Sequence, residues 1–215
     1  MAKFKAVIFD LDGVLVHTDR FHYFAWKATA DELGAYFDET INMRLRGVSR
    51  MESLEIILER YAGPTLSNAE KLALAEKKNS LFRSYLETMT PKDVEPKVPD
   101  VLKKLKAAKL LLAVGSSSKN ARFIIEKIGL LSYFDAVSDG NNIKNSKPDP
   151  EVFLKAAEFL EVSPKNSLVV EDAVSGIEAA IRGGFFAAAT GDAKNHRRAH
   201  FLFDDFDELL SYIIC

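Results

Sequence analysis

Cysteine is almost absent from this chain of 215 residues, in which Cys215 is the only one. A single thiol cannot form an internal disulfide or a cysteine-based zinc site, which is typical of proteins in a reducing cytosol. Long hydrophobic runs are missing too: the longest, such as 110–114, have five residues, whereas a bilayer-spanning helix needs about 20. The N-terminal stretch lacks the hydrophobic region and cleavage site of a signal peptide. We therefore expect a cytoplasmic protein without a membrane segment.

An excess of charge of either sign is also missing, because the formal net charge is only −2. Binding to nucleic acids or anionic membranes depends on clustered positive charge, so neither partner is expected. Hydrophobic residues make up 47% and charged residues 28% of the chain, the ordinary balance of a globular protein. The length suits one large domain, or one domain with a small insertion. Nothing in the sequence indicates an obligate dimer, so we expect a monomer.

Short apolar runs at both ends of the chain predict buried β-strands. The first is 5–9, and four more follow at 110–114, 134–137, 167–170 and 185–189. The later runs alternate with helical patterns, which is typical of a parallel sheet with helices on both faces. The predicted fold class is therefore α/β, with a doubly wound, Rossmann-like parallel sheet as its core.

The stretch from about 18 to 89 gives helix signals only. Ser49 and Ser67 are each followed by a glutamate three residues later, which is the capping-box pattern of a helix N-terminus. Trp26 is expected in the core of this helical block. A helical block after a single strand predicts a small all-helical cap domain inserted after strand 1. The expected domains are an α/β core of residues 1–15 and 92–215 and a cap of residues 16–91.

Polar residues follow several of the predicted strands. Asp10 and Asp12 follow the first, Ser116 the second, and the pair Glu171-Asp172 the fourth, while Lys147 precedes a predicted helix. The carboxyl ends of parallel strands meet at one edge of a sheet, where ligands bind. Carboxylates gathered there repel one another unless a cation or a proton lies among them. Oxygen ligands that leave room for water and phosphate favour Mg²⁺. The sequence thus predicts a magnesium-dependent phosphate site, in which Lys147 and Ser116 neutralise phosphoryl oxygens.

A carboxylate can itself attack phosphorus and form an aspartyl phosphate, which divides one difficult step into two. Asp10, at the end of the strand, is the candidate nucleophile. Asp12 can protonate the leaving oxygen or deprotonate an incoming hydroxyl. Mg²⁺ and Lys147 would screen the repulsion between the anionic nucleophile and the anionic phosphoryl group.

Four segments, in order, resemble the motifs of the haloacid dehalogenase superfamily: Phe9–Val14, Ser116–Asn120, Ser146–Pro150 and Glu171-Asp172. The helical insert is similar to the small mobile cap of that superfamily. Within the insert, Thr18, His22–Lys27, Gly47–Arg50 and Lys78-Asn79 resemble the β-phosphoglucomutase family. The resemblance implies interconversion of β-D-glucose 1-phosphate and D-glucose 6-phosphate, with β-glucose 1,6-bisphosphate as the bound intermediate.

The resemblance also implies roles for individual residues. Asp10 would be the nucleophile and Asp12 the general acid and base, and Mg²⁺ would be held by Asp10, the backbone carbonyl of Asp12, Glu171 and Asp172. Ser116 and Lys147 would bind the transferring phosphoryl group, and Arg50, Ser118, Lys119 and Asn120 the second phosphate. Thr18, His22 and Lys78 would link cap closure to the placement of Asp12, and Arg46, Gly47, Val48 and Ser49 would complete the substrate-binding residues of the cap.

Taken singly, these residues have plainer interpretations. Two aspartates after a strand can simply form a turn, and Glu171-Asp172 can cap the following helix. His22 can be a packing residue, Lys78 a solvated one, and the segment His196–Arg198 plain surface.

Two positions depart from the β-phosphoglucomutase pattern: Arg46 stands where lysine is usual, and Ala173 where serine is frequent. Together with the segment 191–203, which also fits that pattern poorly, they keep open a sugar-phosphate phosphatase with the same nucleophile. A non-catalytic phosphate-binding module is the third possibility.

Overall fold

The computed structural model describes residues 3–45 and 48–214, which form two compact units. One unit runs up to His17 and resumes at Thr90, and the other comprises Thr18–Met89. These boundaries differ by two residues from the expected ones. Val16 accounts for the shift of the first boundary, because it forms β-bridges with Asp12 and Val94 and therefore belongs to the sheet-containing unit.

The sheet-containing unit is built on six parallel strands in the order β3-β2-β1-β4-β5-β6. The strands are β1 (Ala6–Phe9), β2 (Leu111–Gly115), β3 (Ala136–Ser138), β4 (Ser167–Glu171), β5 (Phe186–Ala189) and β6 (Phe201–Leu202). β1 is central, and Ala6 pairs with Leu111 of β2 and with Ser167 of β4. This strand order is that of a doubly wound Rossmann-like sheet, which confirms the predicted fold class.

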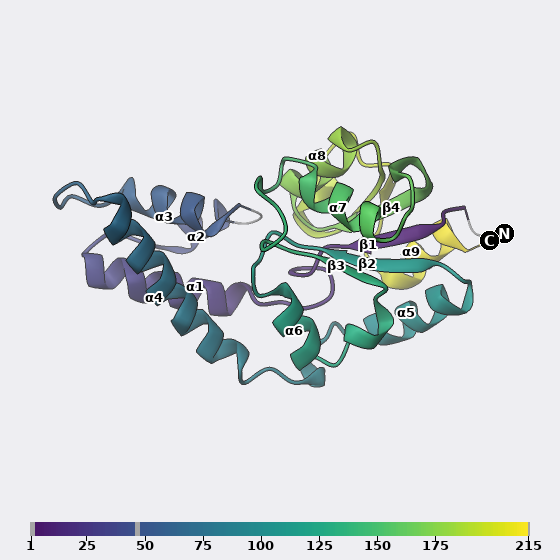
Figure 1. Ribbon diagram of the computed structural model, residues 1–215, viewed down its shortest axis with the longest axis horizontal. Coiled ribbons are helices and arrows are strands. Elements are labelled where there is room, and N and C mark those ends of the chain that lie inside the picture. Colours follow the sequence, from purple (N-terminus) through teal and green to yellow (C-terminus); the bar gives the residue numbers. More distant parts are fainter. Residues whose placement is uncertain (1–2, 46–47, 215) are drawn as a thin grey trace. The chain divides into compact units, whose positions relative to one another are not determined.

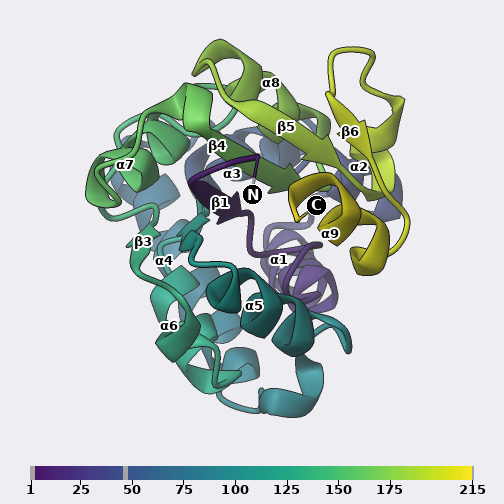
Figure 2. The same cartoon turned by 90° about the vertical axis from the view of Figure 1, so that its right-hand side faces the viewer.

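The sequence predicted five strands, and β6 is the one that was missed. It has two residues, which is too short for a hydrophobic run to be recognised, and it exists through its pairing with Ala188 and Ala189. Figure 2 shows β5 and β6 at the opposite end of the sheet from β3.

Helices cover both faces of the sheet (Figure 1). α7 and α8 lie on one face and α5, α6 and α9 on the other. Their bounds are α5 (Val98–Ala107), α6 (Ala121–Lys127), α7 (Glu151–Phe159), α8 (Val174–Arg182) and α9 (Phe206–Ile213), and short 3₁₀ turns occupy Pro91–Asp93, Leu131–Tyr133, Pro164–Asn166 and Gly191–Asn195. Within residues 3–45 and 48–214, no helix combines the length and the apolar character that crossing a membrane requires.

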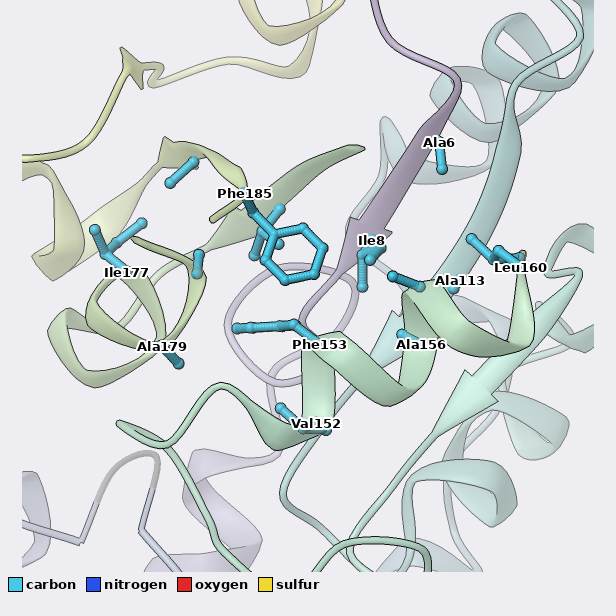
Figure 3. Close-up of a cluster of buried hydrophobic side chains, with 14 of the residues drawn as sticks. Ala6, Ile8, Ala113, Val152, Phe153, Ala156, Leu160, Ile177, Ala179 and Phe185 are labelled. Carbon is cyan, nitrogen blue, oxygen red and sulfur yellow. The ribbon is translucent and has the colours of Figure 1, made fainter. Parts of the chain in front are cut away.

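One hydrophobic core lies between the sheet and the helices α7 and α8, and it helps to explain why the strand sequences are continuous apolar runs. Alternate strand residues such as Ala6, Ile8 and Ala113 pack under Phe153 of α7 and Phe185, which precedes β5 (Figure 3). The intervening residues of β1, Val7 and Phe9, are equally buried on the other face. A strand buried on both faces favours large apolar residues at every position.

The second unit is entirely helical and contains α1 (Asp19–Leu33), α2 (Glu39–Met43), α3 (Arg50–Leu58) and α4 (Asn68–Leu86). Both predicted capping boxes are present, with Ser49 paired to Glu52 and Ser67 to Glu70. Trp26 is buried in the core of this unit, as expected.

Candidate active site

Lys147 joins two carboxylates that come from different strands. Its ammonium group contacts Asp10, which directly follows β1, and donates to Oε1 of Glu171, the last residue of β4, at 2.6 Å. All three side chains are buried. The second carboxylate oxygen of Glu171, Oε2, accepts the backbone N–H of Ala173 at 2.7 Å. Glu171 therefore helps to cap α8, as its plainer interpretation suggested, while it also binds Lys147.

Asp172 completes an acidic group with Asp10 and Glu171. Each of the three residues offers one carboxylate oxygen, and these oxygens lie within 4.8 Å of one another. Asp12 is half-buried in the loop after β1, where its backbone bridges Val16. Three clustered carboxylate oxygens are a donor set suited to a hard divalent cation.

The acidic group contains more carboxyl groups than the single positive charge of Lys147 can compensate. Burial raises the pKa of Asp10 to about 7, although Lys147 opposes this, and the charges of Glu171 and Asp12 add to it. Burial, followed by the charges of Glu171 and Asp10, raises the pKa of Asp172 to about 9. Burial alone would lower the pKa of Lys147, but the charges of Asp10 and Glu171 outweigh it and hold that pKa above its usual range. At neutral pH, without a cation, Asp172 therefore keeps its proton.

The loop after β2 is organised by its own hydroxyl groups. Ser116 Oγ accepts the N–H of Ser118, and Ser118 Oγ accepts the N–H of Asn120, the N-cap residue of α6, each at 3.2 Å. Ser116 and Asn120 are buried, whereas Lys119 is exposed. The carbonyl of Lys119 accepts from Asn141 of the loop after β3. The predicted phosphate-binding segment is thus a structured turn at the carboxyl end of β2.

In the helical unit, the half-buried His22 pairs with the buried Lys78. Lys78 Nζ lies 2.9 Å from His22 Nδ1. It also lies 4.7 Å from the centroid of the Trp26 ring and 4.6 Å from that of the Phe82 ring, which are distances of cation–π contacts. The plainer interpretation of Lys78 as a solvated residue is therefore wrong. Burial, together with the charges of Lys78 and Arg50, holds the pKa of His22 well below its usual value.

Thr18 and the segment before α3 complete the predicted cap residues. Thr18 is buried at the N-cap position of α1, but its side chain does not cap that helix. Val48 is half-buried and Ser49 caps α3. Arg46 and Gly47 lie outside the described residues.

Arg50, at the first position of α3, is held by α4. Its guanidinium donates to Glu76 Oε1 at 2.7 Å and to Asn79 Oδ1 at 2.8 Å. Sequence reasoning did not find Glu76, because no local pattern links residues 26 positions apart. Asn79 follows Lys78 directly, and this pair is one of the segments that resemble the β-phosphoglucomutase family. The resemblance could therefore have indicated a functional role for Asn79.

Residues 4–184 match the model of a family of hydrolases described as haloacid dehalogenase-like hydrolase. This chain belongs to that family. The expectation of a superfamily enzyme, drawn from four short motifs, is thereby confirmed.

Relatives within the family include mutases and phosphatases. The chain is 40% identical over 191 residues to a β-phosphoglucomutase of Bacillus subtilis, covering 88% of this chain and 84% of that protein. It is 36% identical over 183 residues to a phosphorylated carbohydrates phosphatase of Thermotoga maritima, covering 84% and 82%. The crystal structure of a β-phosphoglucomutase from Clostridium difficile superposes with a TM-score of 0.90 at 36% identity, covering 96% and 93%.

Proposed function

We propose that this protein is a phosphomutase that interconverts β-D-glucose 1-phosphate and D-glucose 6-phosphate through an aspartyl-phosphate enzyme and β-glucose 1,6-bisphosphate. The observation that carries the proposal is the contact of the buried Lys147 with Asp10 inside an acidic group. This arrangement pairs a carboxylate nucleophile with a cation that can offset the charge of a phosphoryl group. The 40% identity to a β-phosphoglucomutase supports the choice of reaction and substrate.

The acidic group suits Mg²⁺ as the cofactor. Asp10, Glu171, Asp172 and the backbone carbonyl of Asp12 would hold the ion, and their oxygens are the hard ligands that Mg²⁺ prefers. The raised pKa values of Asp10 and Asp172 fit this use, since a bound cation would stabilise the charged carboxylates that burial and, to a lesser degree, the neighbouring carboxylates disfavour. When bound, Mg²⁺ would stabilise negative charge on the transferring phosphoryl oxygens.

The chain's own residues would divide the chemistry between them. A carboxylate oxygen of Asp10 forms a bond to phosphorus as the bond from phosphorus to the sugar oxygen breaks, and Asp12 donates a proton to that leaving oxygen. In the reverse direction, Asp12 takes the proton of a sugar hydroxyl as that oxygen attacks the phosphoryl group on Asp10. Lys147 and Ser116 bind the phosphoryl oxygens throughout.

A mutase differs from a phosphatase because it keeps its aspartyl phosphate from water and binds a second phosphate. We propose Arg50, Ser118, Lys119 and Asn120 for this second phosphate. Arg50 suits the role because a guanidinium binds phosphate through two parallel hydrogen bonds. Thr18, His22 and Lys78, with Arg46–Ser49, are proposed to couple the cap to substrate binding.

A sugar-phosphate phosphatase is the second candidate. The observations that favour it are the 36% identity to a phosphorylated carbohydrates phosphatase and Ala173, which offers the site a backbone N–H but no hydroxyl. The two functions share every step up to the aspartyl phosphate and differ in what accepts the phosphoryl group.

The deciding experiment supplies β-glucose 1-phosphate, a trace of β-glucose 1,6-bisphosphate and Mg²⁺, and follows both sugar phosphates and free phosphate by ³¹P NMR. A mutase yields glucose 6-phosphate with little free phosphate, whereas release of phosphate without isomer assigns the phosphatase. Arg50→Ala is expected to shift the products toward free phosphate. Arg44→Ala is the matched control, because Arg44 lies in the same unit but pairs on the surface with Glu59.

A further inference from the structure

Gly176 lies in the first turn of α8. Among the glycines that the structure describes, it is the one where an added Cβ would come closest to another atom. A Cβ added there would lie 1.7 Å from Oε1 and 2.0 Å from Cδ of Glu171. Ordinary contacts between heavy atoms are roughly 3.5–4.0 Å. The carboxylate of Glu171 therefore occupies the space that any side chain at residue 176 would fill.

The backbone conformation does not explain this glycine. Gly176 is absent from the glycines with positive φ, and it lies within a regular α-helix. Alanine stabilises a helix interior more than glycine does. Local structure would thus favour a larger residue, and the space taken by Glu171 is what opposes it.

Glu171 has no freedom to give way. Its side chain is almost completely buried, at 1% exposure, and both carboxylate oxygens are already bonded. Oε1, the oxygen nearest to Gly176, is the one that accepts from Lys147, while Oε2 accepts the N–H of Ala173. A side chain at residue 176 must therefore displace either Oε1 from Lys147 or the start of α8 from β4.

We infer that Gly176 is a positioning residue, whose missing side chain leaves the space in which Glu171 holds Lys147 beside Asp10 and completes the acidic group. The inference rests on the proposed function insofar as that group binds Mg²⁺. Gly176 acts through Glu171 and does not itself touch the metal or the substrate.

The test is a double-mutant cycle in urea unfolding with EDTA present, using wild type, Gly176→Ala, Glu171→Ala and the double variant. We expect Gly176→Ala to lower the unfolding midpoint in the wild-type background, and to leave it unchanged or raise it where Glu171 is already alanine. Equal losses in both backgrounds would overturn the inference. If Gly176→Ala fails to fold, the inference requires that the double variant folds. A double variant that does not fold, although Glu171→Ala does, would also overturn the inference.

The second readout is Mg²⁺ affinity, measured by titration calorimetry on the folded proteins. Disturbing a group that supports metal ligands weakens binding by about 10- to 100-fold, which is the loss we expect for Gly176→Ala. The matched control is Ser175→Ala in the same turn, whose buried hydroxyl has no hydrogen-bond partner in the described part of the chain and whose loss should leave affinity unchanged. Wild-type affinity in the folded Gly176→Ala variant contradicts the inference. If wild type binds no Mg²⁺, the proposed function fails, whereas the unfolding cycle still decides the role of Gly176.

Discussion

Lys147 Nζ lies 2.6 Å from Glu171 Oε1 and also contacts Asp10, so one buried ammonium group joins the ends of β1 and β4. The two strands are neighbours in the sheet, yet the three residues are far apart in the chain. The nucleophile proposed for this protein is therefore positioned by a charge network as well as by its strand.

Replacing Lys147 by methionine should destabilise the protein strongly. The substitution leaves Asp10 and Glu171 buried without a compensating charge, and breaking a buried ion pair in this way costs about 3–5 kcal/mol. Urea unfolding at pH 7 measures the loss. Lys155→Met is the control, because Lys155 pairs with Glu158 on the surface, where such a pair contributes less than about 1 kcal/mol. Equal effects of the two substitutions would show that the charge network does not stabilise the fold.

Substitutions of Asp10 and Asp12, the two aspartates after β1, should impair different steps of the reaction. Asp10→Asn removes the proposed nucleophile, so no phosphoenzyme should form with an activated phosphate donor. Asp12→Asn should still be labelled, because such a donor has a leaving group that needs no proton, but turnover of sugar phosphate should fall by about 10²- to 10⁴-fold. Intact-protein mass spectrometry detects the label and a coupled assay the turnover. A labelled Asp10→Asn variant would assign the nucleophile to another residue.

Without a divalent cation, the contribution of Asp10 and Asp172 to stability should fall as the pH rises from about 4 to about 9. In the folded state the pKa of Asp10 is about 7 and that of Asp172 about 9, whereas unfolded aspartates titrate near 3.9. Between these values the two aspartates bind more protons in the folded protein than in the unfolded chain, so the stability that they contribute decreases with pH. Urea midpoints of the wild type and of the Asp10→Asn and Asp172→Asn variants, measured in EDTA across this range, test the sign.

Mg²⁺ should reverse this dependence, because binding requires the carboxylates to lose their protons. Calorimetric titrations at pH 7 in buffers of different ionisation enthalpy should show protons released on binding. Asp172→Asn should abolish much of that release and flatten the fall in metal-free stability above pH 7. Unchanged proton release in Asp172→Asn would contradict the assignment of the raised pKa to this residue.

The lowered pKa of His22 predicts the opposite pH dependence of its contribution to stability at acidic pH. Its pKa in the folded protein lies well below the usual value, because of burial and the charges of Lys78 and Arg50. Below about pH 6.5 this residue takes up a proton in the unfolded chain but not in the folded protein, so the contribution of His22 to stability should fall with decreasing pH. His22→Gln should reduce this slope. The pKa of His200 is lowered as well, so His200→Gln measures the share that belongs to the other unit.

Local sequence patterns predicted those parts of the fold that depend on neighbours in the chain. The two capping boxes and the five longer strands were predictable because each rests on residues within a few positions of one another. β6 could not be predicted in this way. Its two residues are a strand only because β5 lies beside them.

Motif order by itself predicted one site for Asp10, Ser116, Lys147 and Glu171-Asp172, since the carboxyl ends of parallel strands share an edge of the sheet. The structure brings Asp10, Lys147, Glu171 and Asp172 together. Only the tertiary structure decided that Lys147 is divided between two carboxylates, that Lys78 is buried against His22, and that Arg50 is held by Glu76. Such contacts join side chains tens of positions apart. Their charges and burial follow from how the helices and strands pack, which no local pattern records.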